Sequence, residues 1–256
     1  MKTNRQKRAN FKAYAEIFGT HSVYAALANS KRIHQKLYIT QNQRENISPE
    51  LKNLVPETNE LHNKEMFRMF GNEATHQGIV LKTSKLEQPK LKVYIEENKN
   101  SKTDVIIILD QVTDPNNIGA IIRSCSLFNC KSVIVSKDNA PEITGTMAKA
   151  ASGAIETVNY ISVVNLSRAI LDLKKNNYWV YGFDSNEINK NQPIDLPKKC
   201  VLVFGSEGKG LRNLTKKECD SIISIPIKNN KKYNIDSLNV SNACTIALYE
   251  HFKNNK

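Results

Sequence analysis

The sequence contains no long apolar stretch. Its apolar runs, such as VIIIL at residues 105–109, are short, whereas a membrane-spanning helix needs about 20 apolar residues. The charged N-terminal residues are not followed by the apolar core that a secretory signal peptide carries. We therefore predict a cytoplasmic protein that does not associate with a membrane.

Cysteine pairs with CxxC spacing are also absent, and histidine is scarce in the second half. The five cysteines, an odd number, favour reduced thiols over a disulfide framework. Cys125 and Cys244 fall on apolar helical positions, where core packing is the simpler interpretation. From residue 101 onward His251 is the single histidine, which argues against a histidine-based metal site or a Ser-His-Asp triad in that half.

Acidic residues are outnumbered by basic ones. The 37 Lys and Arg exceed the 25 Asp and Glu, which gives a formal net charge of +12. Such an excess suggests a polyanionic partner, although it also serves solubility alone. Residues 1–11 carry no acidic side chain. We interpret them as a basic flexible tail, which is either simply solvated or an arm that contacts nucleic acid.

The pattern along the chain predicts two domains. Residues 12–87 combine a helix pattern at 20–30 with strand patterns at 36–40 and 76–83, as expected of a small α/β domain. Residues 88–102 are rich in charge and poor in structure signals, so we predict a linker there.

The remaining residues, 103–256, alternate strand and helix signals. The strand candidates are short apolar runs at 105–109, 132–136, 179–183, 201–204 and 222–227. Between and after them lie helical patterns at 117–129, 144–157, 165–177, near 215–220 and at 240–252. Strands that are apolar throughout are buried on both faces, so the pattern predicts an α/β fold with a parallel sheet covered on both sides.

Ligands of parallel sheets collect at the carboxyl ends of the strands, and the first loop there is DQVTDPNNIGAIIRS, at 110–124. Asp114 and Pro115 end the strand, and Asn116 or Asn117 can cap the following helix. Arg123 lies beside the apolar stripe of that helix. Since helical side chains lean toward the N-terminus, its guanidinium can reach the loop at Asn117. An arginine that extends to solvent is the simpler alternative.

The second loop is VFGSEGKGLR, at 203–212. Gly205, Gly208 and Gly210 allow the backbone to approach a ligand closely. The spacing is neither that of a Walker A loop nor GxGxxG. Glu207 is a carboxylate at a strand end, where it has little packing purpose.

The third loop lies within IPIKNNKKYNIDSLNVSNA, at 225–243. Ser237, Asn239 and Ser241 cluster before the last helical pattern. Capping of that helix accounts for one of these polar residues and leaves the others unexplained.

Together these three loops resemble the three motifs of the SPOUT-class RNA 2′-O-methyltransferases, in the TrmH/RlmB family. VTDPNNIGAIIRS, FGSEGKGLR and SLNVSNA occur in the order of that family. IFGTHSVYAAL (17–27) and THQGIV (75–80) look like the L30e-like substrate-binding domain of its 23S ribosomal RNA branch. The resemblance implies methylation of a guanosine 2′-hydroxyl in 23S ribosomal RNA. The alternatives are a tRNA guanosine methyltransferase and a non-catalytic RNA-binding protein of the same fold.

The resemblance also implies a deep trefoil knot in the second domain, S-adenosylmethionine as cofactor and a homodimer formed through the knot and the last helix. It implies no metal, because the methyl donor is already positively charged. The catalytic positions that it implies are Asn117, Arg123, Glu207, Ser237 and Asn239. Those that would bind the cofactor are Phe204, Gly205, Gly210, Ile225, Ile227, Ser237 and Leu238.

Two features bear on this expectation. Arginine is effectively never deprotonated, so Arg123 is easier to interpret as a fixed cation that favours the developing alkoxide than as a base. Glu207 would then position Arg123 or relay the proton. The segment IKNNKKYNID (227–236) departs from the family, since it is longer, basic and lacks glycine. This puts the shape of the cofactor loop in doubt.

Overall fold

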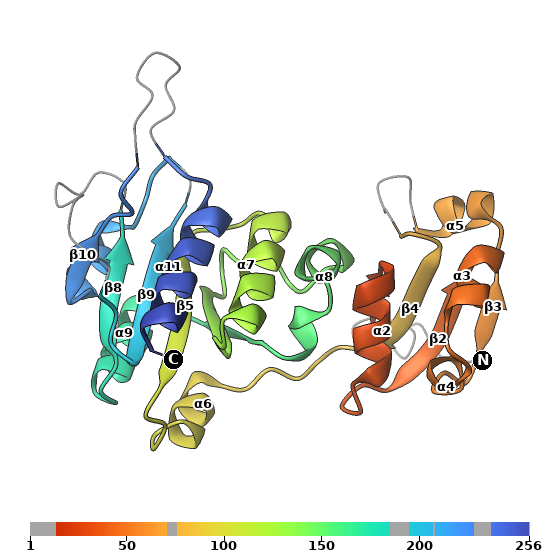
Figure 1. Cartoon of the computed structure of the whole chain (residues 1–256), viewed down its shortest axis with the longest axis horizontal. Helices are drawn as coiled ribbons and strands as arrows, with labels where there is room; N and C mark the ends of the chain where they lie inside the picture. Colours follow the sequence, from red (N-terminus) through yellow and green to blue (C-terminus); the bar gives the residue numbers. More distant parts are fainter. Residues whose placement is uncertain (1–13, 71–75, 185–194, 207, 228–236, 256) are drawn as a thin grey trace, which may run out of the picture. The chain divides into compact units, whose positions relative to one another are not determined.

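The computed structural model describes residues 14–70, 76–184, 195–206, 208–227 and 237–255 (Figure 1). They form two compact units. The first extends to Glu87 and also contains Glu142–Glu156, and the second comprises Gln88–Pro141 and the chain from Thr157 onward. The division at Glu87 coincides with the change in sequence pattern, whereas the return of Glu142–Glu156 to the first unit was not predicted. The chain therefore passes between the units three times.

The first unit contains a four-stranded sheet, counted over the described residues, in the order β1-β4-β2-β3. Its strands are β1 (Tyr14–Phe18), β2 (His34–Ile39), β3 (Thr58–Glu60) and β4 (Ile79–Ser84). Strand β4 is antiparallel to both of its neighbours, and β3 is parallel to β2. The helices from this part of the chain are α2 (Thr20–Ala28), α3 (Gln41–Asn46), α4 (Pro49–Lys52) and α5 (Asn63–Phe70).

The segment that returns to this unit forms helix α8 (Gly145–Ala151) and the 3-10 turn η1 (Ala154–Glu156). The helical pattern predicted at 144–157 is interrupted because Ser152 and Gly153 adopt positive φ angles of 52° and 92°. Two glycines show how closely the segment packs. A Cβ on Gly145 would lie 2.0 Å from the Phe18 ring, and one on Gly153 would lie 2.7 Å from the Ala25 methyl.

The second unit contains a parallel sheet, six-stranded over the described residues, in the order β10-β8-β9-β5-β6-β7. The strands are β5 (Asp104–Asp110), β6 (Ser132–Ser136), β7 (Asn159–Val163), β8 (Trp179–Phe183), β9 (Lys199–Gly205) and β10 (Ser221–Ile223). Every residue of β5 and β6 is buried, which confirms the predicted two-sided sheet. Strand β7 was not predicted, because it is an edge strand that mixes buried with exposed positions.

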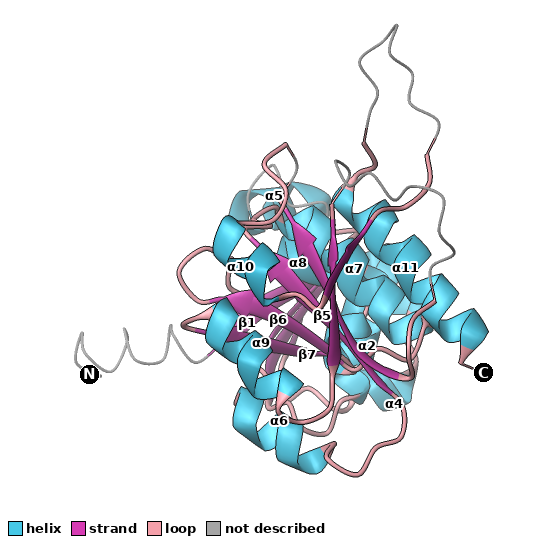
Figure 2. Ribbon diagram, turned by 90° about the vertical axis from the view of Figure 1, so that its left-hand side faces the viewer, coloured by secondary structure: helices cyan, strands magenta, loops and turns pink. Residues whose placement is uncertain are grey.

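Helices cover both faces of this sheet (Figure 2). They are α6 (Leu91–Glu97), α7 (Pro115–Leu127), α9 (Leu166–Lys174), α10 (Asn213–Glu218) and α11 (Val240–Asn254). Helices α7 and α11 lie side by side on one face (Figure 1). Buried residues of α6 and α9 pack with alternate residues of β5 and β9 in one core cluster.

Helix α6 corrects the expectation that residues 88–102 are only a linker. Tyr94 in α6 is 1% exposed, and its hydroxyl donates to both oxygens of Asp104, at 2.9 and 3.1 Å. The Tyr178 hydroxyl donates to the same carboxylate. The charged residues of this segment lie on the exposed side of α6. They dominate the composition of the segment, so the apolar side of the helix was not recognised in the sequence. The segment therefore belongs to the second unit.

Candidate functional site

The carboxyl ends of neighbouring strands form one edge of the six-stranded sheet. Asp110, the last residue of β5, is paired in register with Gly205, the last residue of β9. Next to β9, the backbone N–H of Asp184, just after β8, donates to the carbonyl of Ile223 at the end of β10. All three predicted loops therefore begin or end at this edge, as the parallel topology requires.

The loop after β9 is a tight turn that requires glycine. A Cβ on Gly205 would lie 2.1 Å from the carbonyl carbon of Gly210, so no other residue fits there without displacing backbone. The Gly210 N–H donates to the Ser206 carbonyl at 2.9 Å and closes the turn. Gly208 and Gly210 have φ angles of 85° and 64°, which glycine adopts without strain. Glu207, predicted as catalytic, lies outside the described residues.

A buried carboxylate attaches the far end of this turn to β5. Asp110 is 0% exposed, and its Oδ2 accepts the backbone N–H of Arg212 at 3.1 Å. The Nε–H of the same arginine donates to Oδ1 at 2.6 Å. Neither residue was predicted from the sequence. The signal that was available is the charged residue that ends the otherwise aliphatic run VIIILD.

The first and third motifs meet through two asparagines. Asp114 caps α7 by accepting the N–H of Asn116 at 3.0 Å, so capping by Asn116 or Asn117 was the wrong expectation. Asn117 instead accepts a hydrogen bond at Oδ1 from Nδ2 of Asn239, at 3.0 Å. Asn239 also caps α11, because its Oδ1 accepts the backbone N–H of Ser241 at 2.9 Å. One side chain therefore both begins α11 and joins it to α7.

Arg123 lies on the exposed side of α7. Over the residues that the structure describes, its guanidinium forms no hydrogen bond or ion pair, and it does not bond to Asn117. This geometry leaves the guanidinium available to a ligand or to another chain. Its catalytic role stays a prediction.

The residues predicted to bind a cofactor follow the same strand ends. Phe204 is buried, and its ring stacks on Phe183 with centroids 4.5 Å apart. The others that the structure describes are the two turn glycines, half-buried Ile225, Ile227 and Leu238, and exposed Ser237. Ser224, beside Ile225, has a buried hydroxyl without a hydrogen-bond partner among the described residues. A buried hydroxyl that the protein leaves unpaired fits a neighbouring ligand with polar groups. Residues 228–236, which make up most of the segment that differs from the family pattern, lie outside the described residues.

Two absences apply to the described part of the chain. It contains no group of three His, Cys, Asp or Glu side chains placed to hold a metal ion. None of its helices combines the length and the apolar character needed to span a membrane.

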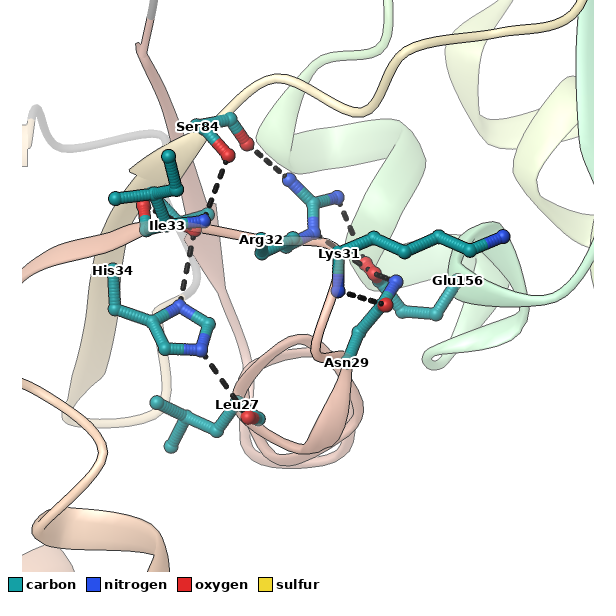
Figure 3. Close-up of polar contacts among 9 residues, drawn as sticks. Leu27, Asn29, Lys31, Arg32, Ile33, His34, Ser84 and Glu156 are labelled. Carbon is teal, nitrogen blue, oxygen red and sulfur yellow. Dashed lines mark hydrogen bonds and ion pairs between the residues drawn. The ribbon is translucent and has the colours of Figure 1, made fainter.

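The first unit contains a buried ion pair that anchors its returning segment (Figure 3). The Nε and Nη2 atoms of Arg32 donate to the two carboxylate oxygens of Glu156, each at 2.8 Å. Nη1 of Arg32 donates to the Ser84 carbonyl at 2.6 Å, and Nδ2 of Asn29 donates to Glu156 at 2.7 Å. The two charged side chains are only 2% and 7% exposed. No local sequence pattern indicates this pair, because its members are 124 residues apart.

Sequence profiles of known families match both halves of the chain. The SpoU rRNA Methylase family profile matches residues 104–249. The profile for RNA 2′-O ribose methyltransferase substrate binding matches residues 17–89. The second match excludes the returning segment, which therefore falls in the methylase profile by sequence and in the first unit by structure.

Individual relatives extend over nearly the whole chain. The 23S rRNA (guanosine-2′-O-)-methyltransferase RlmB of Coxiella burnetii is 36% identical over 241 residues, which cover 91% of this chain and 93% of the relative. The RlmB of Haemophilus influenzae is 33% identical over 245 residues, covering 92% and 96%. An uncharacterized tRNA/rRNA methyltransferase of Synechocystis is 35% identical over 243 residues, which are 93% of this chain but only 62% of that protein.

Among solved structures, the SpoU methyltransferase AviRb of Streptomyces viridochromogenes, crystallised in complex with the cofactor AdoMet, superimposes with a TM-score of 0.73. The superposition covers 98% of this chain and 93% of AviRb at 20% identity. At this identity the likeness establishes a common fold.

Proposed function

Because the chain belongs to the SpoU rRNA methylase family, we propose that it transfers a methyl group from S-adenosylmethionine to the 2′-hydroxyl of a guanosine in 23S ribosomal RNA. The observation that carries the proposal is the hydrogen bond between Asn239 and Asn117. It joins the first and third family motifs at the edge of the sheet where parallel folds bind ligands. The relatives named as 23S guanosine methyltransferases match both units, which favours the ribosomal substrate.

The cofactor would supply an electrophilic methyl group on a positively charged sulfur. We assign its binding to the strand-end residues predicted from the motifs, which are Phe204, Gly205, Gly210, Ile225, Ile227, Ser237 and Leu238. The tight turn at Gly205 brings backbone atoms close together, and beside this set lies the Ser224 hydroxyl, which has no hydrogen-bond partner among the described residues. The trefoil knot implied by the sequence is part of the same proposal.

The remaining motif residues would act on the RNA. Arg123 extends from α7 without a partner among the described residues, and its permanent charge would stabilise the negative charge that develops on the 2′-oxygen. Asn117 and Asn239, held together, would orient the ribose. We keep Ser237 and Glu207 as further candidates, with Glu207 positioning Arg123 or relaying the proton.

The assembly would be a cytoplasmic homodimer that binds RNA through its first unit. The net charge of +12 favours contacts with phosphates. Exposed apolar residues on α7 and α11 support the dimer, since Leu127, Ile246 and Tyr249 are 68%, 37% and 48% exposed. Exposed apolar side chains that gather on neighbouring helices are typical of interfaces.

The test is methylation of purified transcripts with S-adenosylmethionine labelled in its methyl group. We expect label in 23S ribosomal RNA and, after mapping, in the ribose of one guanosine. Deletion of the gene should remove the same 2′-O-methyl group from total RNA. Label found only in tRNA would show that the substrate is tRNA and not 23S ribosomal RNA. A protein that binds no S-adenosylmethionine in calorimetry would instead be an RNA-binding protein of this fold.

A further inference from the structure

We propose that Asp110 is a positioning residue of the methyl-donor site, which acts by holding Arg212 and, through it, the turn between Gly205 and Arg212. This inference deepens the proposed function and rests on it. Asp110 does not have to touch the donor or the RNA. Its role is to fix the backbone of the turn that is assigned to the donor.

The position of Asp110 is unfavourable for a charged side chain. All seven residues of β5 are buried, and Asp110 is 0% exposed at its end. Removing a carboxylate from water is costly unless hydrogen bonds and an opposite charge compensate. An aliphatic residue would continue the strand without that cost. A buried ion pair is therefore weak evidence of a purely stabilising role.

The backbone beside Asp110 is also strained. Gln111 has a φ angle of 63°, in the left-handed region that non-glycine residues seldom occupy. Strained residues persist where the surrounding structure imposes them, and they concentrate at functional sites. The chain thus leaves β5 through a strained residue directly after a buried charge, at the edge that carries the family motifs.

The partners of Asp110 define what it holds. Gly205 is fixed opposite Asp110 by the ladder between β5 and β9. Arg212, seven residues later, is fixed by its backbone N–H at 3.1 Å and its Nε–H at 2.6 Å from the same carboxylate. Both the first and the last residue of the turn, Gly205 and Arg212, are therefore attached to Asp110. Without the carboxylate, the Arg212 end loses both of these hydrogen bonds to β5.

The chain offers a control with similar bonding at the amino ends of the strands, although its side chain is 17% exposed and that of Asp110 is 0% exposed. Asp220 accepts the backbone N–H of Val180 at 2.9 Å and pairs with Lys174 at 2.6 Å. It therefore combines a backbone donor with a cation, as Asp110 does. It lies at the amino end of β10 and β8, away from the motifs. Substitution of either aspartate should reduce the stability of the protein, whereas only substitution of Asp110 should weaken binding of S-adenosylmethionine.

The test compares Asp110→Asn with Asp220→Asn in the full-length protein. Calorimetry measures the affinity for S-adenosylmethionine, and a filter assay measures the affinity for RNA. We expect Asp110→Asn to bind the donor at least about 10-fold more weakly, with RNA affinity within about twofold of the wild type. Asp220→Asn should match the wild type in both. Wild-type donor affinity in a folded Asp110→Asn protein overturns the inference.

Arg212→Lys serves as a second variant in case Asp110→Asn does not fold. The Arg212 side chain is 41% exposed, so the change is tolerated, and it removes the Nε–H that bonds Asp110 while it keeps the charge. We expect weaker donor binding again, and unchanged binding would count against the proposal. If the wild type itself binds no S-adenosylmethionine, the proposed function fails. If the wild type binds it and both Asp110→Asn and Arg212→Lys bind it equally well, only the role of Asp110 is refuted.

Discussion

Arg32 and Glu156 form a buried ion pair with two parallel hydrogen bonds, although one lies in the substrate-binding profile and the other in the methylase profile. The planar guanidinium fits a carboxylate in this two-point arrangement better than any other cationic side chain. The pair therefore attaches the segment after α8 to the first unit with a defined geometry.

Removal of this arginine should destabilise the first unit strongly. Arg32→Ala leaves the Glu156 carboxylate buried without its cation, which typically costs about 3–5 kcal/mol. Arg44→Ala is the control, because the pair of Arg44 with Glu60 is 57% and 41% exposed and such pairs contribute at most about 1 kcal/mol. Urea unfolding measures both. Equal losses in the two variants would show that the buried pair is unimportant.

A double variant tests whether the loss of stability comes from the unpaired buried charge or from the missing hydrogen bonds. Replacing both members by apolar residues, as in Arg32→Met with Glu156→Leu, leaves no unpaired buried charge, so we expect much of the stability to return. A double variant that is no more stable than Arg32→Ala would mean that the hydrogen bonds to Ser84 and Asn29 matter more than the charges.

Asn239 should have two separable roles. Asn239→Asp keeps an oxygen that caps α11 but loses the N–H that donates to Asn117, whereas Asn239→Ala loses both. We expect the alanine variant to lose about 1 kcal/mol of stability through the missing cap, and the aspartate variant to lose little. Both should slow single-turnover methyl transfer by at least about 10-fold. Full activity in Asn239→Asp would exclude a role for the N–H that Asn239 donates to Asn117.

The charge geometry of Arg123 should matter for the chemical step. Arg123→Lys keeps the charge but loses the planar fork, so we expect a lower single-turnover rate at saturating donor and RNA. Arg168→Lys is the control, since Arg168 is likewise exposed, on α9. Glu207→Gln should also lower the rate if Glu207 positions Arg123. Wild-type rates in both Arg123→Lys and Glu207→Gln would remove these residues from the site.

The affinity for RNA should depend steeply on salt. The logarithm of the association constant falls linearly with the logarithm of the salt concentration. Each phosphate that a basic side chain neutralises makes this slope steeper by roughly 0.7–0.9. Removing the charge of the basic tail, by substituting glutamine at Lys2, Arg5, Lys7 and Arg8, should therefore flatten the slope while the length of the chain stays the same. A slope identical to the wild type would show that the tail does not touch RNA.

Stability should decrease as the solution becomes mildly acidic. His76 is buried, and this burial lowers its pKa below the ordinary 6.5, an effect to which Lys149 adds. Burial likewise lowers the pKa of His251. As pH falls through 6.5, the unfolded chain takes up these protons before the folded one does, so folding stability declines.

The corresponding measurement is the denaturation midpoint at pH 8 and pH 5.5. Nδ1 of His76 accepts the N–H of Gly78 at 3.0 Å, and protonation would remove that acceptor. His76→Asn keeps an acceptor there and does not titrate, so its midpoint should vary less with pH than that of the wild type. An equal variation in both proteins would assign the effect to other groups.

The predictability of the fold follows from burial. The runs at 105–109 and 132–136 became β5 and β6 because a strand covered on both faces has only apolar positions. β1 was missed because it is short and mixes Glu16 with apolar residues, and β7 because it lies at an edge. α6 was concealed because its charged side faces solvent.

One contact at the candidate site could be expected from the motifs, whereas the roles of the site residues stay predictions. The motifs placed Asn117 and Asn239 together, and the structure joins them directly. The pairing of Asp110 with Arg212 was not predicted, since the two residues are 102 residues apart and the carboxylate at the end of VIIILD does not indicate its partner. Only the three-dimensional pairing shows that one of them is fully buried.

The three passages of the chain between the two units have a practical consequence for anyone who divides this protein. A fragment that begins at Gln88 would keep α8 but lose the sheet and helix on which it packs. Met147, Ala148 and Ala151, now buried, would then face water. The boundary between the sequence profiles is thus a poor place to divide the protein. Helix α8 lies within the methylase profile, but the residues that bury its apolar side belong to the first unit.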